Sequence, residues 1–573
     1  MSSEYETAMS PAAGRPAAPA GRPDTKRDSG QAPGRRGWFG LATLSAGLGL
    51  IVLDGTIVGV ALPQIIPEIG LTLTTAQWVN SLYAVLLAAL LLSSGKLADR
   101  FGRRRLFLSG LGIFVVGSAL AATADSAAPL LWARAIQAIG AAFIMPSTLS
   151  TVNAVFRGKY RAAAFGVWGA VISGAAAVGP LLGGALTQWA SWHWIFLVNI
   201  PLGIAVAVSA LFTVPETRGG EQRRGADVDG ALLSAIGLGA LVFAVVQGPS
   251  TGWWTPIREF SLGGFTWPAD ATIGPVPVAI AVAAVALCLF AVWEKHREHN
   301  RRSALLDTRL FAIRTFSWGN LTAGAVGVGE FALIFVLPLY LVNVLGLGLM
   351  ASGLVIAGMA IGAFLSGAMA RHLAAAVGAP ATVVIGLSLE LLGVAALIVI
   401  IGPDTPGWLV AAPLVVYGLG LGLASAQLTS TVLRDVPVAE SGQASATQST
   451  VRQVGTALGT AVAGAALSVA LAAVLPASLE SESVPAGDAE QLVAQTTESA
   501  GSNIPAQRDR AEAGVGHGGA EQEAIAEALG AGFADGTRWA LGVAAVFLLA
   551  GLGGAGAVWR ASRSAEERPA AGA

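Results

Sequence analysis

The chain has 573 residues, of which 54% are hydrophobic and only 12% are charged, and its formal net charge is −1. Soluble globular domains carry about 25% charged residues, so this composition excludes a protein that covers its whole surface with polar side chains. We expect membrane lipids, and no nucleic acid, among its partners.

Long apolar runs dominate the chain from residue 39 onward. A run of about 20 apolar residues is needed to cross a bilayer. Fourteen candidates follow one another: 39–61, 77–98, 106–124, 130–153, 162–186, 194–214, 230–248, 277–294, 317–343, 351–371, 380–401, 408–431, 453–475 and 537–559. Backbone groups in lipid must be hydrogen-bonded within their own segment, which favours helices. The sequence therefore predicts an all-α integral membrane protein with fourteen transmembrane helices.

The distribution of Lys and Arg predicts the topology. The loops that alternate to one side hold twenty Lys and Arg, whereas the loops on the other side hold three. Because positive residues accumulate on the cytoplasmic side, we expect both termini in the cytoplasm of a bacterial plasma membrane. Residues 1–37, rich in Pro, Ala, Gly and Arg, are typical of a disordered tail, and residues 561–573 form a second cytoplasmic tail.

The spans group into two blocks of six with an insertion between them. Residues 38–214 form a predicted N-terminal six-helix bundle, residues 316–560 a C-terminal one, and residues 215–315 two inserted helices with their linkers. The segment SGKLADRFGRRR (94–105) has a loose echo in SGAMARHLAAAVG (366–378), each after the second span of its block. Duplicated six-helix halves are a transporter architecture, with sites at the interface between the halves.

One outer segment, residues 476–536, contains eleven Asp and Glu against two basic residues. We interpret it as an acidic extracellular loop, in which AEQEAIAEALG forms a short amphipathic helix. The alternative is a flap that attracts cations toward an outer vestibule.

Charged residues inside the predicted spans are the strongest functional candidates. Asp54 and Arg134 lie in spans one and four, Glu330 in span nine and Glu390 in span eleven. Each such charge costs roughly 2.5–3.5 kcal/mol at mid-bilayer, so proton relay or cation binding is the default hypothesis. We assign proton coupling to Asp54, Arg134 and Glu330. The alternatives are a helix-pinning hydrogen bond for Asp54 and a structural salt bridge for Arg134.

A second set of residues is predicted to line a substrate cavity. Aromatic rings stack on lipophilic cations, and Gln137 lies one helical turn beyond Arg134; the set is Gln137, Trp168, Tyr83, Tyr340, Tyr417 and Glu390. Core filling is the alternative for each aromatic residue. For Glu390 the alternatives are a protonated side chain that faces lipid and a pair with a neighbour.

Six motifs, in this order on the predicted spans, resemble one family. They are LDGTIVGVALPQI (53–65), GKLADRFGRRRLFLSG (95–110), RAIQAIGAAFIMPS (134–147), GVWGAVISGAAAVGPLLGGAL (166–186), WHWIFLVNIPLG (192–203) and SGQASATQSTVRQVGTALGTA (441–461). Together they resemble the first-helix motif, motifs A, B and C, and two further marks of the fourteen-span drug:proton antiporter branch of the major facilitator superfamily. Gly59 stands where that branch usually has Asn, so we expect extra space near Asp54.

Motifs A and C suggest different physical roles. Motif A (Gly95, Asp99, Arg100, Gly102, Arg103 and Arg104) places a carboxylate among arginines at a helix end, where contacts formed only when the two halves close would favour one access state. The alternative is a plain positively charged inner loop. Motif C (Gly166, Gly174, Gly179, Pro180, Gly183 and Gly184) leaves much of span five without side chains, which predicts close helix packing and a bend at the proline.

The resemblance implies two six-helix bundles plus two extra central helices. It also implies a monomeric, proton-coupled exporter that moves lipophilic, often cationic, drugs or antibiotics by alternating access. No G-x-x-x-x-G-K-[ST] phosphate loop occurs in the sequence, so we expect the proton gradient as energy source, with no cofactor, metal or catalytic residue. The alternatives are an exporter of an endogenous secondary metabolite or siderophore and, from another class, a membrane sensor.

Overall fold

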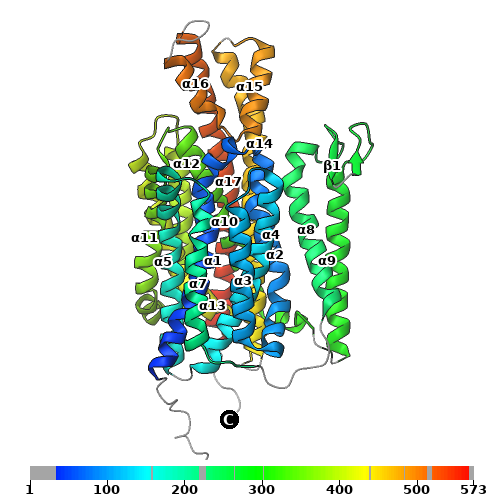
Figure 1. The fold of residues 1–573 in the computed structure, drawn as a ribbon, viewed down its shortest axis with the longest axis vertical. Coiled ribbons are helices and arrows are strands. Elements are labelled where there is room, and N and C mark those ends of the chain that lie inside the picture. Colours follow the sequence, from blue (N-terminus) through cyan, green and yellow to red (C-terminus); the bar gives the residue numbers. More distant parts are fainter. Residues whose placement is uncertain are drawn as a thin grey trace, which may run out of the picture.

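The structure is a computed structural model that describes residues 34–156, 159–218, 227–262, 265–300, 302, 304–437, 440–482, 484–512 and 519–566. It is an elongated helical bundle (Figure 1). The two predicted tails lie mostly outside these ranges, and the first helix already begins at Arg35.

Two sets of long helices make up the bundle, and an inserted pair lies between them in the chain. The first half comprises α1 (Arg35–Glu68), α2 (Leu73–Phe101), α3 (Arg103–Ala121), α4 (Ala127–Val155), α5 (Lys159–Trp189), α6 (Trp194–Leu197) and α7 (Asn199–Thr213). The second half comprises α10 (Arg314–Asn343), α11 (Leu349–Val377), α12 (Ala379–Ile400), α13 (Gly407–Val432), α14 (Ser441–Ser481) and α17 (Gly519–Glu566), with α15 (Ala486–Glu498) and α16 (Asn503–Glu512) before α17.

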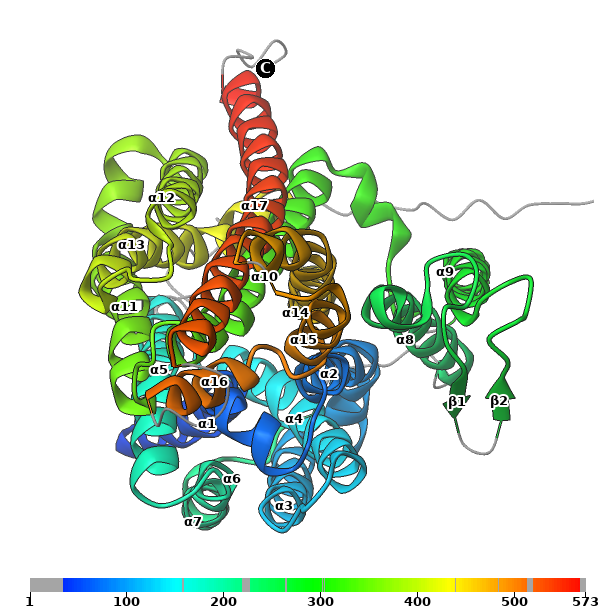
Figure 2. The same ribbon diagram turned by 90° about the horizontal axis from the view of Figure 1, so that it is seen from above.

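The inserted pair is α8 (Val228–Thr251) and α9 (Pro275–His299), followed by the short helix η1 (Thr308–Ala312). Between α8 and α9, β1 (Phe260–Leu262) and β2 (Phe265–Trp267) form an antiparallel hairpin with Phe260 opposite Trp267. From the sequence only a linker was expected between these two helices. Viewed from above, the pair stands at the edge of the bundle beside α2 (Figure 2), and α8 contacts both α2 and α14.

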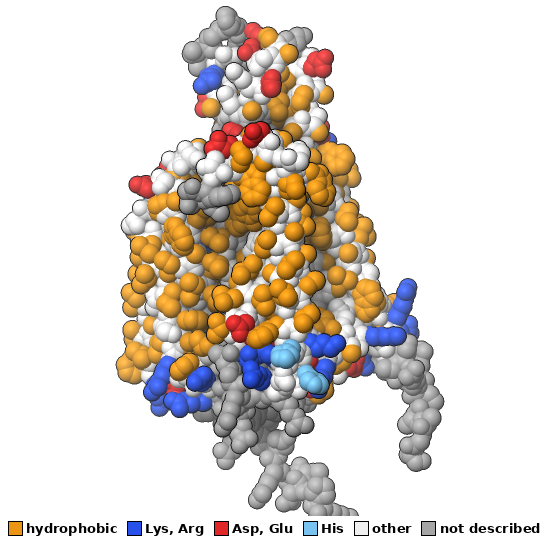
Figure 3. All heavy atoms as spheres, turned by 90° about the vertical axis from the view of Figure 1, so that its right-hand side faces the viewer, with side chains coloured by type: hydrophobic (Ala, Val, Ile, Leu, Met, Phe, Trp, Pro, Cys, Tyr) orange, Lys and Arg blue, Asp and Glu red, His pale blue; other side chains and the backbone are white. Residues whose placement is uncertain are grey.

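Within the described residues, thirteen helices are long and apolar enough to cross a membrane. The fourteenth predicted span, 162–186, falls on the 31-residue helix α5, part of which lies outside the described residues. On the face shown in Figure 3, apolar side chains form a band, with Lys and Arg gathered below it and most acidic residues above it. We refer to the end that carries residues 100–105 as the arginine-rich end and to the end that carries α15 and α16 as the acidic end.

The two halves repeat one packing scheme. In the first half α1 packs on α5, and α4 packs on both α2 and α3; in the second half α10 packs on α14, and α13 packs on both α11 and α12. Across the interface, α5 packs on α11, α2 on α14 and α1 on α10.

The acidic segment 476–536, which joins the last two predicted spans, is mostly helical in its described part. Helix α14 continues to Ser481, and α17 begins at Gly519, so AEQEAIAEALG forms the first turns of a 48-residue helix and not a separate short one. Buried apolar side chains explain the extension, because Leu475 and Leu479 on α14 share a core with Leu529 and Phe533 on α17. Apolar residues at helical spacing therefore keep the two helices packed together beyond the predicted spans.

Candidate functional site

Asp54 lies at the centre of a closed hydrogen-bonded cluster in the first half. Its Oδ2 accepts a hydrogen bond from Arg134 Nη1 at 2.5 Å. Its Oδ1 accepts hydrogen bonds from Gln137 Nε2 at 3.0 Å and from Asn199 Nδ2 at 2.8 Å. None of these four side chains is more than 1% exposed. The carboxylate is therefore neutralised by one cation and hydrogen-bonded by three donors, away from solvent.

The guanidinium of Arg134 is held in place by several groups. Its Nε donates to Val79 O at 3.2 Å, and its Nη1 also donates to Gln137 Oε1 at 3.0 Å. The Tyr83 ring lies against it, with 4.3 Å between the guanidinium carbon and the ring centroid. That geometry is a cation–π contact, which strengthens when it is desolvated. Tyr83 and Gln137, predicted to line a substrate cavity, thus belong to the Asp54 cluster in this conformation.

Helix geometry explains why these groups meet. Arg134 and Gln137 are three residues apart on α4 and therefore share one face. Asn199 is the first residue of α7, and Ser118 lies near the end of α3. The Ser118 hydroxyl accepts hydrogen bonds from Gln137 Nε2 at 2.8 Å and Asn199 Nδ2 at 3.4 Å.

Sequence reasoning missed Asn199 and Ser118 as site residues. A signal for Asn199 was present, since it is a polar side chain inside the otherwise apolar span 194–214 and inside a quoted motif. Ser118 gave none, because serines hydrogen-bond their own helix at little cost and are common in membrane spans.

The side chain that Gly59 lacks leaves no extra space at that position, contrary to expectation. Gly59 lies where α1 meets α10, and a Cβ atom there would be 3.0 Å from Ile334 Cγ2 and 3.3 Å from Ile334 O. The small residue is used for close contact between the two halves, and Ile334 fills the volume that the missing side chain leaves. The expectation was wrong because the neighbouring helix was unknown.

The second half contains a more open ion pair. Arg452 Nη2 lies 3.3 Å from Glu330 Oε2, and the two side chains are 46% and 11% exposed. The predicted span 453–475 leaves Arg452 in the loop before it, but Arg452 lies inside α14, which begins at Ser441. This correction places a cation beside Glu330 within the helical bundle.

The remaining predicted cavity residues do not form a single cluster. Glu390 on α12 and Tyr417 on α13 are fully buried between these helices. Tyr340 is also fully buried, and its hydroxyl donates to Gly402 O at 2.6 Å near the acidic end. Trp168 on α5 is partly buried against the core of the first half. Glu390 therefore does not face lipid in this conformation.

Motif A makes its described contacts inside the first half. Asp99 Oδ1 pairs with Arg103, at 2.9 Å to Nε and 2.8 Å to Nη2, and Arg103 Nη1 donates to Ser150 O on α4 at 2.9 Å. Arg104 N donates to Glu216 Oε1 at 3.1 Å. Gly102 has a φ of +109°, and a Cβ atom there would lie 2.6 Å from the Glu216 carboxylate. The expected contacts between the halves are not formed by these groups in this conformation.

Contacts between the halves gather toward the acidic end. On α5, a Cβ atom at Gly184 would lie 2.6 Å from Leu349 O, and one at Gly353 on α11 would lie 2.5 Å from Pro180 O. Between α2 and α14, Ser81 Oγ donates to Ala457 O at 3.2 Å and Gln77 Nε2 to Ala461 O at 3.4 Å. The α2 residues belong to the part of that helix nearest the acidic end.

The other motif C glycines differ in how closely neighbouring helices approach them. Gly179 and Gly183 face α1, where a Cβ atom would lie 2.0 Å from Thr56 Oγ1 and 2.8 Å from Ile57 O respectively. At Gly174 no atom of the described residues lies within 4 Å of such a Cβ atom. Gly166 lies on α5, but its surroundings fall outside the described residues. Close packing thus involves the acidic-end half of motif C.

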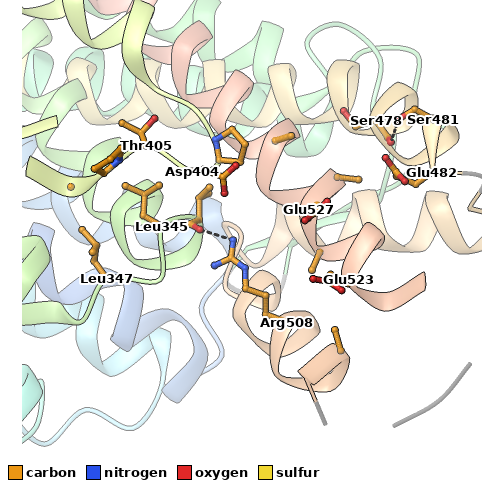
Figure 4. A pocket seen from close by; sticks show the side chains of 18 residues that line it. Leu345, Leu347, Asp404, Thr405, Ser478, Ser481, Glu482, Arg508, Glu523 and Glu527 are labelled. Atoms are coloured by element: carbon orange, nitrogen blue, oxygen red, sulfur yellow. Dashed lines mark hydrogen bonds between the residues drawn. The ribbon is translucent and has the colours of Figure 1, made fainter. Parts of the chain in front are cut away.

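A cavity of about 850 Å³ lies at the acidic end, between the loops after α10 and α12 and the extensions of α14 and α17. Figure 4 shows Arg508 reaching across it, where Arg508 Nη2 donates to Val344 O at 2.7 Å. Four acidic side chains line the cavity, and all of them are exposed: Asp404, Glu482, Glu523 and Glu527. They are typical of a solvated acidic surface.

Comparisons with known proteins agree on one family. Residues 44–460 match the family model described as Major Facilitator Superfamily. The puromycin resistance protein pur8 of Streptomyces alboniger is 32% identical over 436 residues, covering 75% of this chain and 81% of that protein. The multidrug efflux pump LfrA of Mycolicibacterium smegmatis is 32% identical over 426 residues, covering 74% and 79%. The riboflavin transporter RibZ of Clostridioides difficile is 28% identical over 424 residues, covering 74% and 86%.

A solved structure shares the fold. It is a crystal structure of a bacterial homologue of the human lysosomal transporter Spinster, in an inward-facing and occupied conformation. The match has a TM-score of 0.60 at 18% identity and covers 95% of this chain and 100% of that chain.

Proposed function

The chain belongs to the major facilitator superfamily and is a membrane transporter, not an enzyme; from that premise we propose that it is a proton-coupled exporter of lipophilic drug-like molecules. The observation that carries the proposal is the fully buried pair of Asp54 and Arg134. Intramembrane charges in transporters mark proton or substrate pathways, because an unused charge there is costly.

The pair couples protonation to structure. When Asp54 is ionised, Arg134 and the two amide donors hold it. When Asp54 takes a proton, Arg134 loses its counter-ion in a site with no exposed surface, so the cluster must rearrange. Breaking a buried ion pair costs about 3–5 kcal/mol, which is comparable to the roughly 2.3 kcal/mol per 100 mV that one proton gains from the membrane potential.

The orientation follows from the charge distribution. The arginine-rich end faces the cytoplasm, by the positive-inside rule. The present conformation, with its contacts between the halves toward the acidic end, is then closed to the outside. In it Asp54 is ionised, as expected after its proton has been released inward. Proton entry from outside would load Asp54 in the opposite conformation and drive the alternation of the two halves.

Relatives support the substrate class. The puromycin resistance protein and the multidrug efflux pump are named for drug-like molecules. A second candidate is export of an endogenous metabolite, and the riboflavin transporter among the relatives favours it. Both candidates use the same proton-coupled cycle and differ only in the molecule that is carried.

Transport in inverted membrane vesicles tests the proposal. A panel of fluorescent lipophilic cations, antibiotics and riboflavin is added outside, and uptake is followed with an acid-inside pH gradient and after its collapse by an ionophore. We expect gradient-dependent uptake of at least one lipophilic cation or antibiotic. Uptake that persists at full rate after the collapse contradicts proton coupling, and uptake of riboflavin alone favours the metabolite exporter.

A further inference from the structure

The interface between α3 and α4 in the first half is repeated between α12 and α13 in the second half. A Cβ atom at Gly110 would lie 2.8 Å from Gly140 O, and one at Gly386 would lie 2.7 Å from Gly420 O. The spacing of Gly110 and Gly117 on α3 equals that of Gly386 and Gly393 on α12. The two helix pairs are therefore packed in the same register.

This register assigns equivalent positions. A Cβ atom at Gly140 would lie 2.5 Å from Phe114 N, and one at Gly420 would lie 2.5 Å from Glu390 N. Glu390 therefore occupies the position of Phe114, a fully buried core residue. The same comparison holds one turn further along: a Cβ atom at Gly117 would lie 2.7 Å from Gln137 N, and one at Gly393 would lie 2.8 Å from Tyr417 N.

Two polar side chains thus lie in the core of the second half. Glu390 is 0% exposed, and neither of its carboxyl oxygens has a hydrogen-bond partner among the described residues. The Tyr417 hydroxyl, also fully buried, has none in the same part of the chain. An ionised carboxylate without a donor or a cation is strongly disfavoured in such surroundings, whereas the neutral acid is tolerated. Glu390 therefore carries a proton in this conformation.

Glu390 shares its surroundings with the open ion pair of the second half. Glu330 on α10 and Arg452 on α14 act electrostatically on Glu390. The same two residues, together with Glu390, act on Tyr417 on α13. Arg452 therefore acts electrostatically on both carboxyl groups. Because an apolar interior disfavours a second unbalanced charge, one of the two acids is ionised and the other neutral. In this conformation Glu330 is the paired one, at 3.3 Å from Arg452.

We propose that Glu390 and Glu330 share one coupling proton, with Arg452 as the counter-ion of whichever acid is ionised. In the conformation closed at the acidic end, this proton is bound to Glu390. Proton transfer from Glu390 to Glu330 leaves Glu390 ionised and Glu330 neutral, and the total charge is unchanged. Glu330 and Arg452 are partly exposed, so they form the open end through which this proton exchanges with water. The proposal rests on the proposed proton-coupled transport and adds a second proton site to it.

Two measurements on the purified full-length protein test the proposal. Infrared spectroscopy reports protonated carboxyl groups by their carbonyl band. We expect this band in the wild-type protein and in Asp54→Asn, and its partial loss in Glu390→Gln, whose amide has nearly the shape of the neutral acid. An unchanged band in Glu390→Gln shows that Glu390 is ionised and overturns the assignment.

The second measurement is the number of protons exchanged per substrate, from the membrane potential and pH gradient at which net transport reverses in proteoliposomes. We expect Glu390→Gln to transport with one proton fewer per substrate than wild type. If wild type is coupled to the gradient but the variant exchanges the same number of protons, Glu390 is only a buried structural acid and the inference fails. If wild type shows no coupling, the proposed function itself fails, and the infrared band still reports the protonation of Glu390.

Discussion

Arg134 Nη1 lies 2.5 Å from Asp54 Oδ2, and this ion pair is completed by amide donors from two other side chains without any exposed surface. The pair joins α1 to α4, so its state of protonation is linked to how these two helices of the first half pack. A proton on Asp54 and the contact with Arg134 are competing ways of neutralising one carboxylate.

Removing the arginine should destabilise the protein in a pH-dependent manner. Arg134→Ala leaves the Asp54 carboxylate buried without its cation, and we expect a loss of about 3–5 kcal/mol in the free energy of unfolding at neutral pH. The loss should shrink as the pH falls, because Asp54 can then take a proton and become neutral. Thermal unfolding of the detergent-solubilised protein across a pH series measures both effects.

The control is Arg105→Ala, which removes a side chain that is 70% exposed and 3.7 Å from Glu216. A surface ion pair of this kind contributes about 0–1 kcal/mol, so little change is expected at any pH. Equal losses in the two arginine variants would contradict a special role for Arg134.

The two residues that the sequence did not identify should differ in importance. Asn199 donates directly to Asp54, whereas Ser118 only accepts from the amides around it. A hydrogen bond to a charged group contributes about 1.5–3 kcal/mol, so Asn199→Ala should lower gradient-driven uptake by about tenfold or more. Ser118→Ala, which leaves all three donors on Asp54, should have a clearly smaller effect in the same assay. The reverse order would mean that the cluster is only structural.

A site residue can be predicted from the sequence only if its side chain is energetically costly inside a membrane span. Asp54 and Arg134 can be identified from sequence because a charge in a twenty-residue apolar run is expensive. Asn199 and Ser118 cost little in a span, so only the rotation and neighbours of α7 and α3 reveal their role. Arg452 was misplaced because α14 begins twelve residues before the apolar run that starts at 453.

For the fold as well, some features can be predicted from the sequence and others cannot. The order of the membrane-spanning helices follows from hydropathy, which is a local property of the chain. The helical extension of α14 and α17 and the contact of Gly59 with Ile334 depend on which helices become neighbours. Span boundaries chosen by apolar length therefore stop too early where a helix continues by packing on another helix.

Steric bulk at the crossing of α5 and α11 should block transport. A side chain at Gly184 would collide with the backbone of Leu349 in the second half, so Gly184→Val should prevent closure at the acidic end and abolish gradient-driven uptake. Gly174→Ala lies on the same helix, where no described atom is within 4 Å of an added Cβ atom, and should transport at nearly the wild-type rate. Equal activity of the two variants, at equal amounts of folded protein, would argue against this contact as a site of closure.

The orientation can be tested with single cysteines. Cys288 is the one cysteine of the chain, so Cys288→Ala gives a background for Arg105→Cys at the arginine-rich end and Glu490→Cys on α15, both at exposed positions. In intact cells an impermeant maleimide should label the cysteine at 490 and not the one at 105, and in inverted vesicles the pattern should reverse. Labelling of both from the same side would overturn the proposed topology.

Two activities of Asp54→Asn in proteoliposomes test whether Asp54 carries a coupling proton. One is accumulation of a transported lipophilic cation driven by a pH gradient, and the other is its exchange at equal pH on both sides, which needs no net proton movement. Asp125→Asn, which changes an exposed acid of the same half, serves as the control. We expect Asp54→Asn to lose accumulation but to retain exchange. Gradient-driven accumulation at the wild-type level in Asp54→Asn would contradict a coupling role for Asp54.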